Sequence, residues 1–343
     1  GSTSSILLNA PGVPGTVATS FDGYPMAQQG KAGKALAIAA WSSFAGGTLS
    51  AIYLLFMAPS LSKVSLSFRS PDYFALMILG LTAIAAFSSK GQFLKAMMMV
   101  VLGLMLASVG QDSLSDITRF TFDNMNLTDG ISFVLVVMST FAMSEALTII
   151  LKRNDPTAAA KQVSLTELGS IRINKEERGK MYRTIPRSSV IGFLIGVLPG
   201  AGATIASFLA YGMERNLVKD EEKEKFGKGS VNGLSAPETA NNAACSGSFV
   251  PMLTLGIPGS GTTAVMLGAL LGFGIQPGPR LYMTNPEIFW SVIMSMYIGM
   301  VILLILNLPL IPYIARILAV PKNYLIPLIL FFSITGIYVM SFN

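Results

Sequence analysis

The chain has no histidine and only one cysteine, Cys245, among its 343 residues. The lack of histidine excludes histidine metal ligands, histidine general bases and histidine proton relays. A single cysteine excludes both an internal disulfide and a metal site built from cysteines. Charge is also scarce, since Asp, Glu, Lys and Arg make up 12% of the residues, against about 25% in a typical soluble domain. These deficits argue against a soluble enzyme.

The chain is correspondingly rich in apolar residues. Hydrophobic residues make up 52% of the chain, and the mean hydropathy is +0.59. Several apolar runs approach the roughly 20 residues that a helix needs to cross a bilayer. We therefore predict an all-α, polytopic transmembrane bundle. The runs are 36–58, 73–87, 93–109, 131–151, 188–213, 243–275, 288–318 and 324–342. In 288–318, Pro309 and Pro312 predict a kink or a helix followed by a turn.

The charges between these runs predict an orientation. Residues 152–187 carry nine bases and four acids, and the positive-inside rule places such a loop in the cytoplasm. Residues 110–130 carry four acids and one base, and we expect them outside. The charges of 214–230 are balanced, which predicts a short solvated helix. It lies outside if 188–213 crosses the membrane and inside if 188–213 folds back at Pro199-Gly200.

Three segments are too polar and too rich in glycine and proline for ordinary membrane helices: residues 1–30, 192–204 and 236–263. Non-helical backbone at membrane depth persists only where protein buries it or where it lines a wet cavity. Broken helices of this kind form the binding sites of secondary transporters. Close helix packing through small residues is the alternative, and it explains Gly192 and Gly196 well. Pro-Gly breaks favour binding loops instead.

The first and third segments resemble each other. LLNAPGVPGTVAT and TLGIPGSGTTAV share an apolar approach, a Pro-Gly break and a Thr-rich exit. This similarity predicts a weak two-fold internal repeat, an arrangement that marks many transporter sites. We divide the chain into a first repeat (1–151, with 1–30 re-entrant), a basic linker (152–187) and a second repeat (188–343). No start methionine precedes Gly1, and an apolar run reaches the other end, so we expect a longer protein to extend beyond both.

The candidate site residues are the amides, hydroxyls and backbone breaks of the three segments. No Lys or Arg lies within the first or third segment, and Arg280 only follows the latter. An anion would therefore be held by neutral groups and a co-bound cation. The candidate substrate ligands are Ser2, Thr3, Ser4, Asn9, Pro11, Gly12, Gly200, Ala201, Gly202, Asn241, Asn242, Gly259, Ser260, Thr262 and Thr263. The candidate cation ligands are Asn9, Thr204, Glu238, Thr254 and Gly256.

Three carboxylates are further candidates, because an ionisable group at membrane depth is a functional candidate by default. Glu238 joins Asn241 and Asn242 as a site group, with a helix cap as the alternative. Asp22 is either a site residue or a turn residue before Gly-Tyr-Pro. Glu145 is either a site residue or the ion-pair partner of a base.

Several motifs together resemble one family. GSTSSILLNAPG, DGYPMA, TRFTF with LTDGISFV, GxxxGxLPGAGATIASF, APETANNAA and LTLGIPGSGTTAVMLGAL are similar to the large membrane subunit of the tripartite tricarboxylate transporters. They run in family order from residue 1 to about 282, whereas the chain after 290 matches only in hydropathy. The family's first glycine motif, expected before GSTSS, is absent from this chain, as are its last helices.

The resemblance implies an elevator-type secondary transporter of the bacterial inner membrane, with no catalytic residues. It implies two protein partners, a small four-helix membrane subunit and a periplasmic solute-binding protein that delivers a citrate-like di- or tricarboxylate. It also implies coupling to a sodium or proton gradient, so that Na⁺ is the one expected bound ion and no organic cofactor is expected. The alternatives are an intramembrane enzyme, for which no nucleophile–base pair stands out, and a non-transporting scaffold, which needs no broken segments.

Overall fold

The computed structural model is predominantly helical. It describes residues 1–9, 13–65, 92–112, 117–131, 169–198 and 202–310, with scattered positions at 69–78, 135–151 and 327–338. Its main helices are α1 (Ser2–Leu8), α2 (Val17–Gln28), α3 (Ala32–Ser65), α5 (Phe93–Ala107), α7 (Lys175–Val197), α8 (Gly202–Leu217), α9 (Asp220–Lys223), α10 (Val231–Gly247), α11 (Phe249–Leu255), α12 (Gly261–Gly272), α13 (Leu281–Thr284) and α14 (Pro286–Asn307). The 3₁₀ turns are η1 (Pro14–Thr16) and η2 (Met125–Leu127), and the strands are β1 (Gly110–Gln111) and β2 (Thr118–Arg119).

This architecture confirms the predicted helical class. The strands β1 and β2 form one short antiparallel pair, with Gly110 opposite Arg119. Helix α5 matches the apolar run predicted at 93–109. The runs predicted at 73–87, 131–151 and 324–342 fall mostly outside the described residues, so these spans remain predictions.

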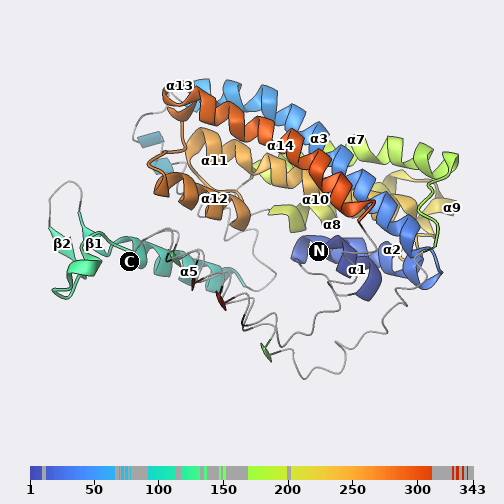
Figure 1. Cartoon of the computed structure of the whole chain (residues 1–343), viewed down its shortest axis with the longest axis horizontal. Coiled ribbons are helices and arrows are strands. Elements are labelled where there is room, and N and C mark those ends of the chain that lie inside the picture. The colour runs from blue at the N-terminus through green and yellow to red at the C-terminus, as the bar shows by residue number, and fades with distance from the viewer. Residues whose placement is uncertain are drawn as a thin grey trace.

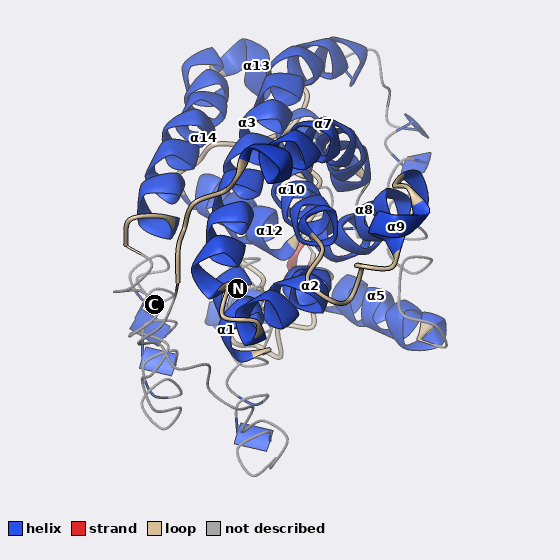
Figure 2. Cartoon of the chain, turned by 90° about the vertical axis from the view of Figure 1, so that its right-hand side faces the viewer, coloured by secondary structure: helices blue, strands red, loops and turns tan. Residues whose placement is uncertain are grey.

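Helix α10 lies at the centre of the bundle, with α3, α7 and α8 around it (Figure 2). Small residues make this possible, because they let helix backbones approach closely. A Cβ added at Gly46 of α3, or at Gly192 or Gly196 of α7, would lie within 2.6 Å of a carbonyl oxygen of α10. The packing interpretation of the Gly192-x-x-x-Gly196 pair is therefore confirmed.

Two of the described helices are long and apolar enough to cross a membrane: residues Ala32–Leu61 of α3, and α14. At 1.5 Å per residue, the 22 residues of α14 span roughly 33 Å, about the thickness of the hydrocarbon core. The two helices run alongside each other over the bundle (Figure 1). Helix α14 ends two residues before Pro309, as the proline predicted.

Helices α7 and α8 form a hairpin, which decides between the two alternatives for 188–213. Lys180 near the start of α7 bonds Glu222 just after α8, with 3.0 Å between Nζ and Oε1. Farther along, Arg187 pairs with Glu214. The chain therefore folds back, and 214–230 lies on the same side as the start of α7. The expected short helix is there too, as α9.

The first and third polar segments contain similar helical hairpins. Helix α1 has seven residues and is capped at its C-terminus by Asn9, whose φ of 49° is left-handed. Helix α11 also has seven residues and is capped by Gly256, whose φ is 71°. After each Pro-Gly stretch a 12-residue helix follows, α2 in one case and α12 in the other. A left-handed residue that ends a helix is a common stop signal, and glycine or asparagine suits it best.

The expectation of broken backbone throughout 236–263 is wrong in its first half. Helix α10 continues through Ala236–Gly247, with Pro237 inside it. Neighbouring helices bury most of this stretch, and tertiary packing of that kind overrides weak helix propensity. Apart from the turn at Ser248 between α10 and α11, the irregular backbone is confined to residues 256–260, after α11.

Candidate functional site

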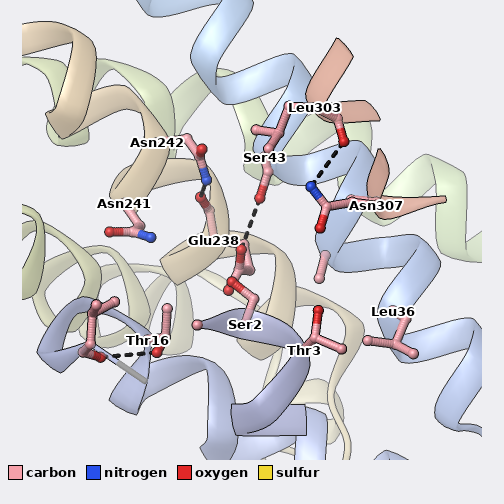
Figure 3. A pocket seen from close by; sticks show the side chains of 14 residues that line it. Ser2, Thr3, Thr16, Leu36, Ser43, Glu238, Asn241, Asn242, Leu303 and Asn307 are labelled. Carbon is pink, nitrogen blue, oxygen red and sulfur yellow. Dashed lines mark hydrogen bonds between the residues drawn. The ribbon is translucent and has the colours of Figure 1, made fainter. Parts of the chain in front are cut away.

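A cavity of about 260 Å³ lies where α1 and η1 meet α3, α10 and α14 (Figure 3). Most of its polar lining consists of hydroxyl and amide groups. Glu238 is the one ionisable side chain among the lining residues, and none of them is basic. The polar side chains are Ser2, Thr3, Thr16, Ser43, Glu238, Asn241, Asn242 and Asn307, and the rest of the lining is Gly1, Val13, Leu36, Ala39, Ala40 and Leu303.

Glu238 is fully buried in the middle of α10. Its carboxylate joins two other elements to this helix. Thr19 of α2 donates a hydroxyl hydrogen bond to Oε1 over 2.5 Å, and Ser43 of α3 donates to Oε2 over 2.8 Å. No Lys or Arg of the described residues forms an ion pair with it. The helix-cap interpretation of Glu238 is wrong, because α10 begins seven residues earlier, at Val231.

The two asparagines predicted beside Glu238 also line the cavity. The side-chain amide of Asn242 donates to the carbonyl oxygen of Glu238 over 3.0 Å (Figure 3), and its amide oxygen accepts no hydrogen bond from another described residue. Asn241 lies next to the loop of the α1–α2 hairpin, which we call the first hairpin. A Cβ added at Gly15 would come within 2.7 Å of the Asn241 side-chain oxygen, so a larger residue there would displace this amide.

The first hairpin lines the cavity beside α10. Ser2 and Thr3, at the start of α1, are half-buried and line the cavity (Figure 3). Ser4 is close by, but its hydroxyl donates to the carbonyl oxygen of Gly1 over 2.8 Å. Asn9 is exposed at the far end of α1 and does not line the cavity. The structure therefore unites Ser2, Thr3, Glu238, Asn241 and Asn242, and the Asn9 assignment fails for this cavity.

The candidates of the third segment form a separate group at the loop between α11 and α12. Ser260 caps α12, because its hydroxyl accepts from the backbone N–H of Thr263 over 3.3 Å while the Thr263 hydroxyl accepts from the backbone N–H of Ser260 over 2.9 Å. Gly259 packs against Ser248, which follows α10. None of these residues lines the cavity. The group comprises Thr254, Gly256, Gly259, Ser260, Thr262 and Thr263.

Two candidates of the second segment are described, and both lie at the start of α8. Gly202 has a left-handed φ of 61°, and Thr204 is half-buried one turn from the break. Neither lines the cavity, although the neighbouring Ala203 approaches Gly15 of the first hairpin. The remaining candidates, Pro11, Gly12, Gly200, Ala201 and Glu145, fall outside the described residues.

Asp22 has a structural role. It is fully buried in α2, so the turn interpretation is wrong. Its Oδ1 accepts from the backbone N–H groups of Gly227, Gly229 and Ser230 over 2.6–2.9 Å, and Oδ2 accepts from the Tyr211 hydroxyl over 3.0 Å. The carboxylate thus fixes the turn that leads into α10.

Four lining or carboxylate-binding residues were missed in the sequence: Thr16, Thr19, Ser43 and Asn307. Ser43 and Asn307 lie in or beside predicted apolar spans, where a lone polar side chain is a weak signal, because serine is common in membrane helices. Thr16 and Thr19 belong to the Thr-rich exit of the first Pro-Gly break. This Thr-rich stretch predicted that the segment is functional, but it did not single out Thr16 or Thr19.

Comparison with known proteins places the chain in a family. The profile of the "Tripartite tricarboxylate transporter TctA family" matches residues 1–343. The chain belongs to this family. It is 41% identical over 343 residues to an "Uncharacterized 52.8 kDa protein in TAR-I ttuC' 3'region" of Agrobacterium vitis, a match that covers all of this chain and 67% of the relative. No solved structure matches it.

A second relative from Agrobacterium vitis is an "Uncharacterized protein in TAR-II ttuC' 3'region". It is 45% identical over 152 residues, which is 44% of this chain and 62% of the relative. This chain spans about two thirds of the first relative. Membership of the TctA family makes it a membrane component of a tripartite transport system, which confirms the family resemblance.

Proposed function

We propose that this TctA-family chain imports a di- or tricarboxylate across the bacterial inner membrane, and that the cavity beside Glu238 holds the substrate. The supporting observation is that five separate elements place hydroxyls and amides around one cavity that a buried carboxylate borders. The volume of about 260 Å³ is just below the range of about 300–1,000 Å³ for drug-sized ligands. A small organic acid suits that size.

In this proposal neutral donors bind the substrate. The hydroxyls of Ser2, Thr3 and Thr16 and the amides of Asn241 and Asn307 surround the cavity, and such groups donate to carboxylate oxygens. Because no basic side chain is among the lining residues, the site offers no permanent positive charge. The substrate therefore needs an accompanying cation, as expected for a coupled transporter.

Glu238 supplies the physical reason for coupling. Two unit negative charges about 4 Å apart repel by roughly 4 kcal/mol at an effective dielectric constant of 20. A carboxylate substrate in the cavity would meet this repulsion unless Glu238 carries a proton or a bound Na⁺. Either cation removes the repulsion, and by linkage the substrate strengthens cation binding to the same degree. Thr19 and Ser43 hold the carboxylate in place for both states.

The transport movement that we propose is a displacement of one wall of the cavity relative to the other. The first hairpin and α10 form one wall, and α3 and α14 form the other. The similar hairpins α1–α2 and α11–α12 fit a two-fold repeat, in which unwound segments near the membrane centre form the site. The α11–α12 loop, which lies outside the cavity, would then serve the second half of the cycle.

We place the chain in an assembly with a small membrane subunit and a periplasmic binding protein that delivers the carboxylate. Radiolabelled uptake into proteoliposomes of the assembled system tests this directly. We expect accumulation of one or more carboxylates from a panel including citrate, only with the binding protein present. Replacing sodium by choline separates the two coupling ions, since unchanged uptake points to protons. Failure of every carboxylate to accumulate contradicts the proposal.

A further inference from the structure

A second cavity, of about 780 Å³, opens between α3, the segment 171–173 and α7. It shares no lining residue with the cavity beside Glu238. Its floor is apolar and its rim is cationic. The floor includes Trp41, Phe44, Met181 and Ile185, and the rim includes the exposed residues Arg172, Arg178 and Tyr182. We call this site the arginine-rimmed groove.

The floor of the groove belongs to the surface of a membrane helix. Trp41 is 41% exposed on α3, inside the stretch that is long enough to cross a bilayer. Its ring packs edge-on against Phe44, with 6.0 Å between ring centroids. Trp and Tyr side chains concentrate at the boundary between hydrocarbon and headgroups. Trp41 on the floor and Tyr182 at the rim place the groove at that boundary.

The rim carries positive charge that the described residues do not neutralise. Neither Arg172 nor Arg178 has a carboxylate within ion-pair distance there, and the neighbouring acids are already occupied. Glu177 pairs with Lys34, and Glu176 pairs with Lys180. Two exposed guanidinium groups above an aromatic floor can therefore bind an anion. Arginine forks match phosphate oxygens well.

We propose that the arginine-rimmed groove binds one anionic phospholipid. The phosphate lies between Arg172 and Arg178, and an acyl chain covers Trp41 and Phe44. An anionic lipid combines the two chemistries that the groove presents, and basic pockets between membrane helices are known to select such headgroups. Because the groove lies at the start of α7, a bound lipid would hold the first half of α3 against the end of the basic linker.

Fluorescence quenching tests the proposal, because the chain has only two tryptophans. In a Trp290→Phe background Trp41 alone reports. The protein is reconstituted in nanodiscs with either phosphatidylglycerol or phosphatidylcholine brominated on its acyl chains, at equal mole fraction. We expect stronger quenching by the anionic lipid. Arg172→Gln with Arg178→Gln should weaken the anionic preference by about fivefold for each arginine removed.

The matched control is Lys219→Gln with Lys228→Gln, which removes the same charge from exposed positions outside the groove. It should retain the preference. Equal quenching by the two lipids in the unaltered background overturns the proposal and indicates an ordinary lipid contact or a surface covered by a protein subunit. A preference that survives loss of both arginines also overturns it.

Discussion

Asp22 and Glu238 are both fully buried carboxylates, but their surroundings differ. Asp22 accepts three backbone N–H groups and a tyrosine hydroxyl, so fixed donors satisfy it. Glu238 accepts two side-chain hydroxyls and borders a cavity. Backbone donors hold a carboxylate in one fixed position, whereas rotatable hydroxyls accommodate a change of ligand. Asp22 therefore stabilises the fold, whereas our proposal gives Glu238 the coupling role.

The largest effect is expected at Glu238. Glu238→Gln keeps the shape of the side chain and removes its charge; one of the hydroxyls of Thr19 and Ser43 still donates to the amide oxygen, and the other accepts from the new amide NH2. We expect gradient-driven uptake to fall at least 100-fold, because the coupling cation loses its ligand, while the yield of folded protein stays normal. Uptake of radiolabelled carboxylate into proteoliposomes measures this. Glu224→Gln, at an exposed position, is the control and should transport normally.

Asp22 should respond in the opposite way. Asp22→Ala leaves three backbone N–H groups without their acceptor, and each hydrogen bond to a charged group contributes about 1.5–3 kcal/mol. We expect a loss of roughly 3 kcal/mol of stability, seen as a lower melting temperature in detergent. Asp220→Ala, at an exposed position of α9, should change little. A stable Asp22→Ala protein that fails only in transport would invert the comparison.

A neutral ligand of the cavity should show an intermediate effect on transport. Asn241→Ala removes one amide from the cavity wall and breaks no side-chain hydrogen bond to another described residue. We expect the apparent substrate affinity to fall by about tenfold, the loss associated with roughly 1.4 kcal/mol. The maximal rate should change less. Asn216→Ala, exposed on α8, should match the unaltered protein, and an equal effect at both positions would exclude a site role.

The smallest effect is expected in the charged segment 214–230, at Glu222. Burial on its own raises the pKa of Glu222, but hydrogen bonds and charge from Lys225 and Lys180 lower the pKa overall. A lowered folded-state pKa adds stability above the ordinary carboxyl pKa, and this stability is lost as the pH falls through and below that value. Glu222→Gln should cost at most about 1 kcal/mol at neutral pH, and the difference should vanish near pH 3. A constant difference from pH 7 to pH 3 would contradict this.

The sequence predicts the helical class, the unusual segments and half of the site. Glycine and proline breaks inside apolar sequence pointed to Ser2, Thr3, Glu238, Asn241 and Asn242, because such breaks are costly in a membrane without a function. Glu238 was recognisable as an isolated carboxylate in a long apolar and small-residue stretch.

The remainder depends on three-dimensional packing. Thr19 and Ser43 reach Glu238 across 219 and 195 residues of chain, and no local pattern encodes such a contact. The helical state of Ala236–Gly247 was missed because proline and asparagine disfavour helix locally, whereas the surrounding helices stabilise it. The two Pro-Gly motifs are similar in sequence, so they could not show that the first lies beside the cavity and that the α11–α12 loop lies outside it.

The most direct test of coupling at Glu238 compares two transport modes in the same proteoliposomes. Gradient-driven accumulation requires the coupling cation, whereas exchange of labelled for unlabelled substrate requires only binding and movement. We predict that Glu238→Gln abolishes accumulation and preserves exchange. Accumulation at the unaltered rate in Glu238→Gln would contradict the assignment, and the coupling site would have to lie elsewhere in the protein.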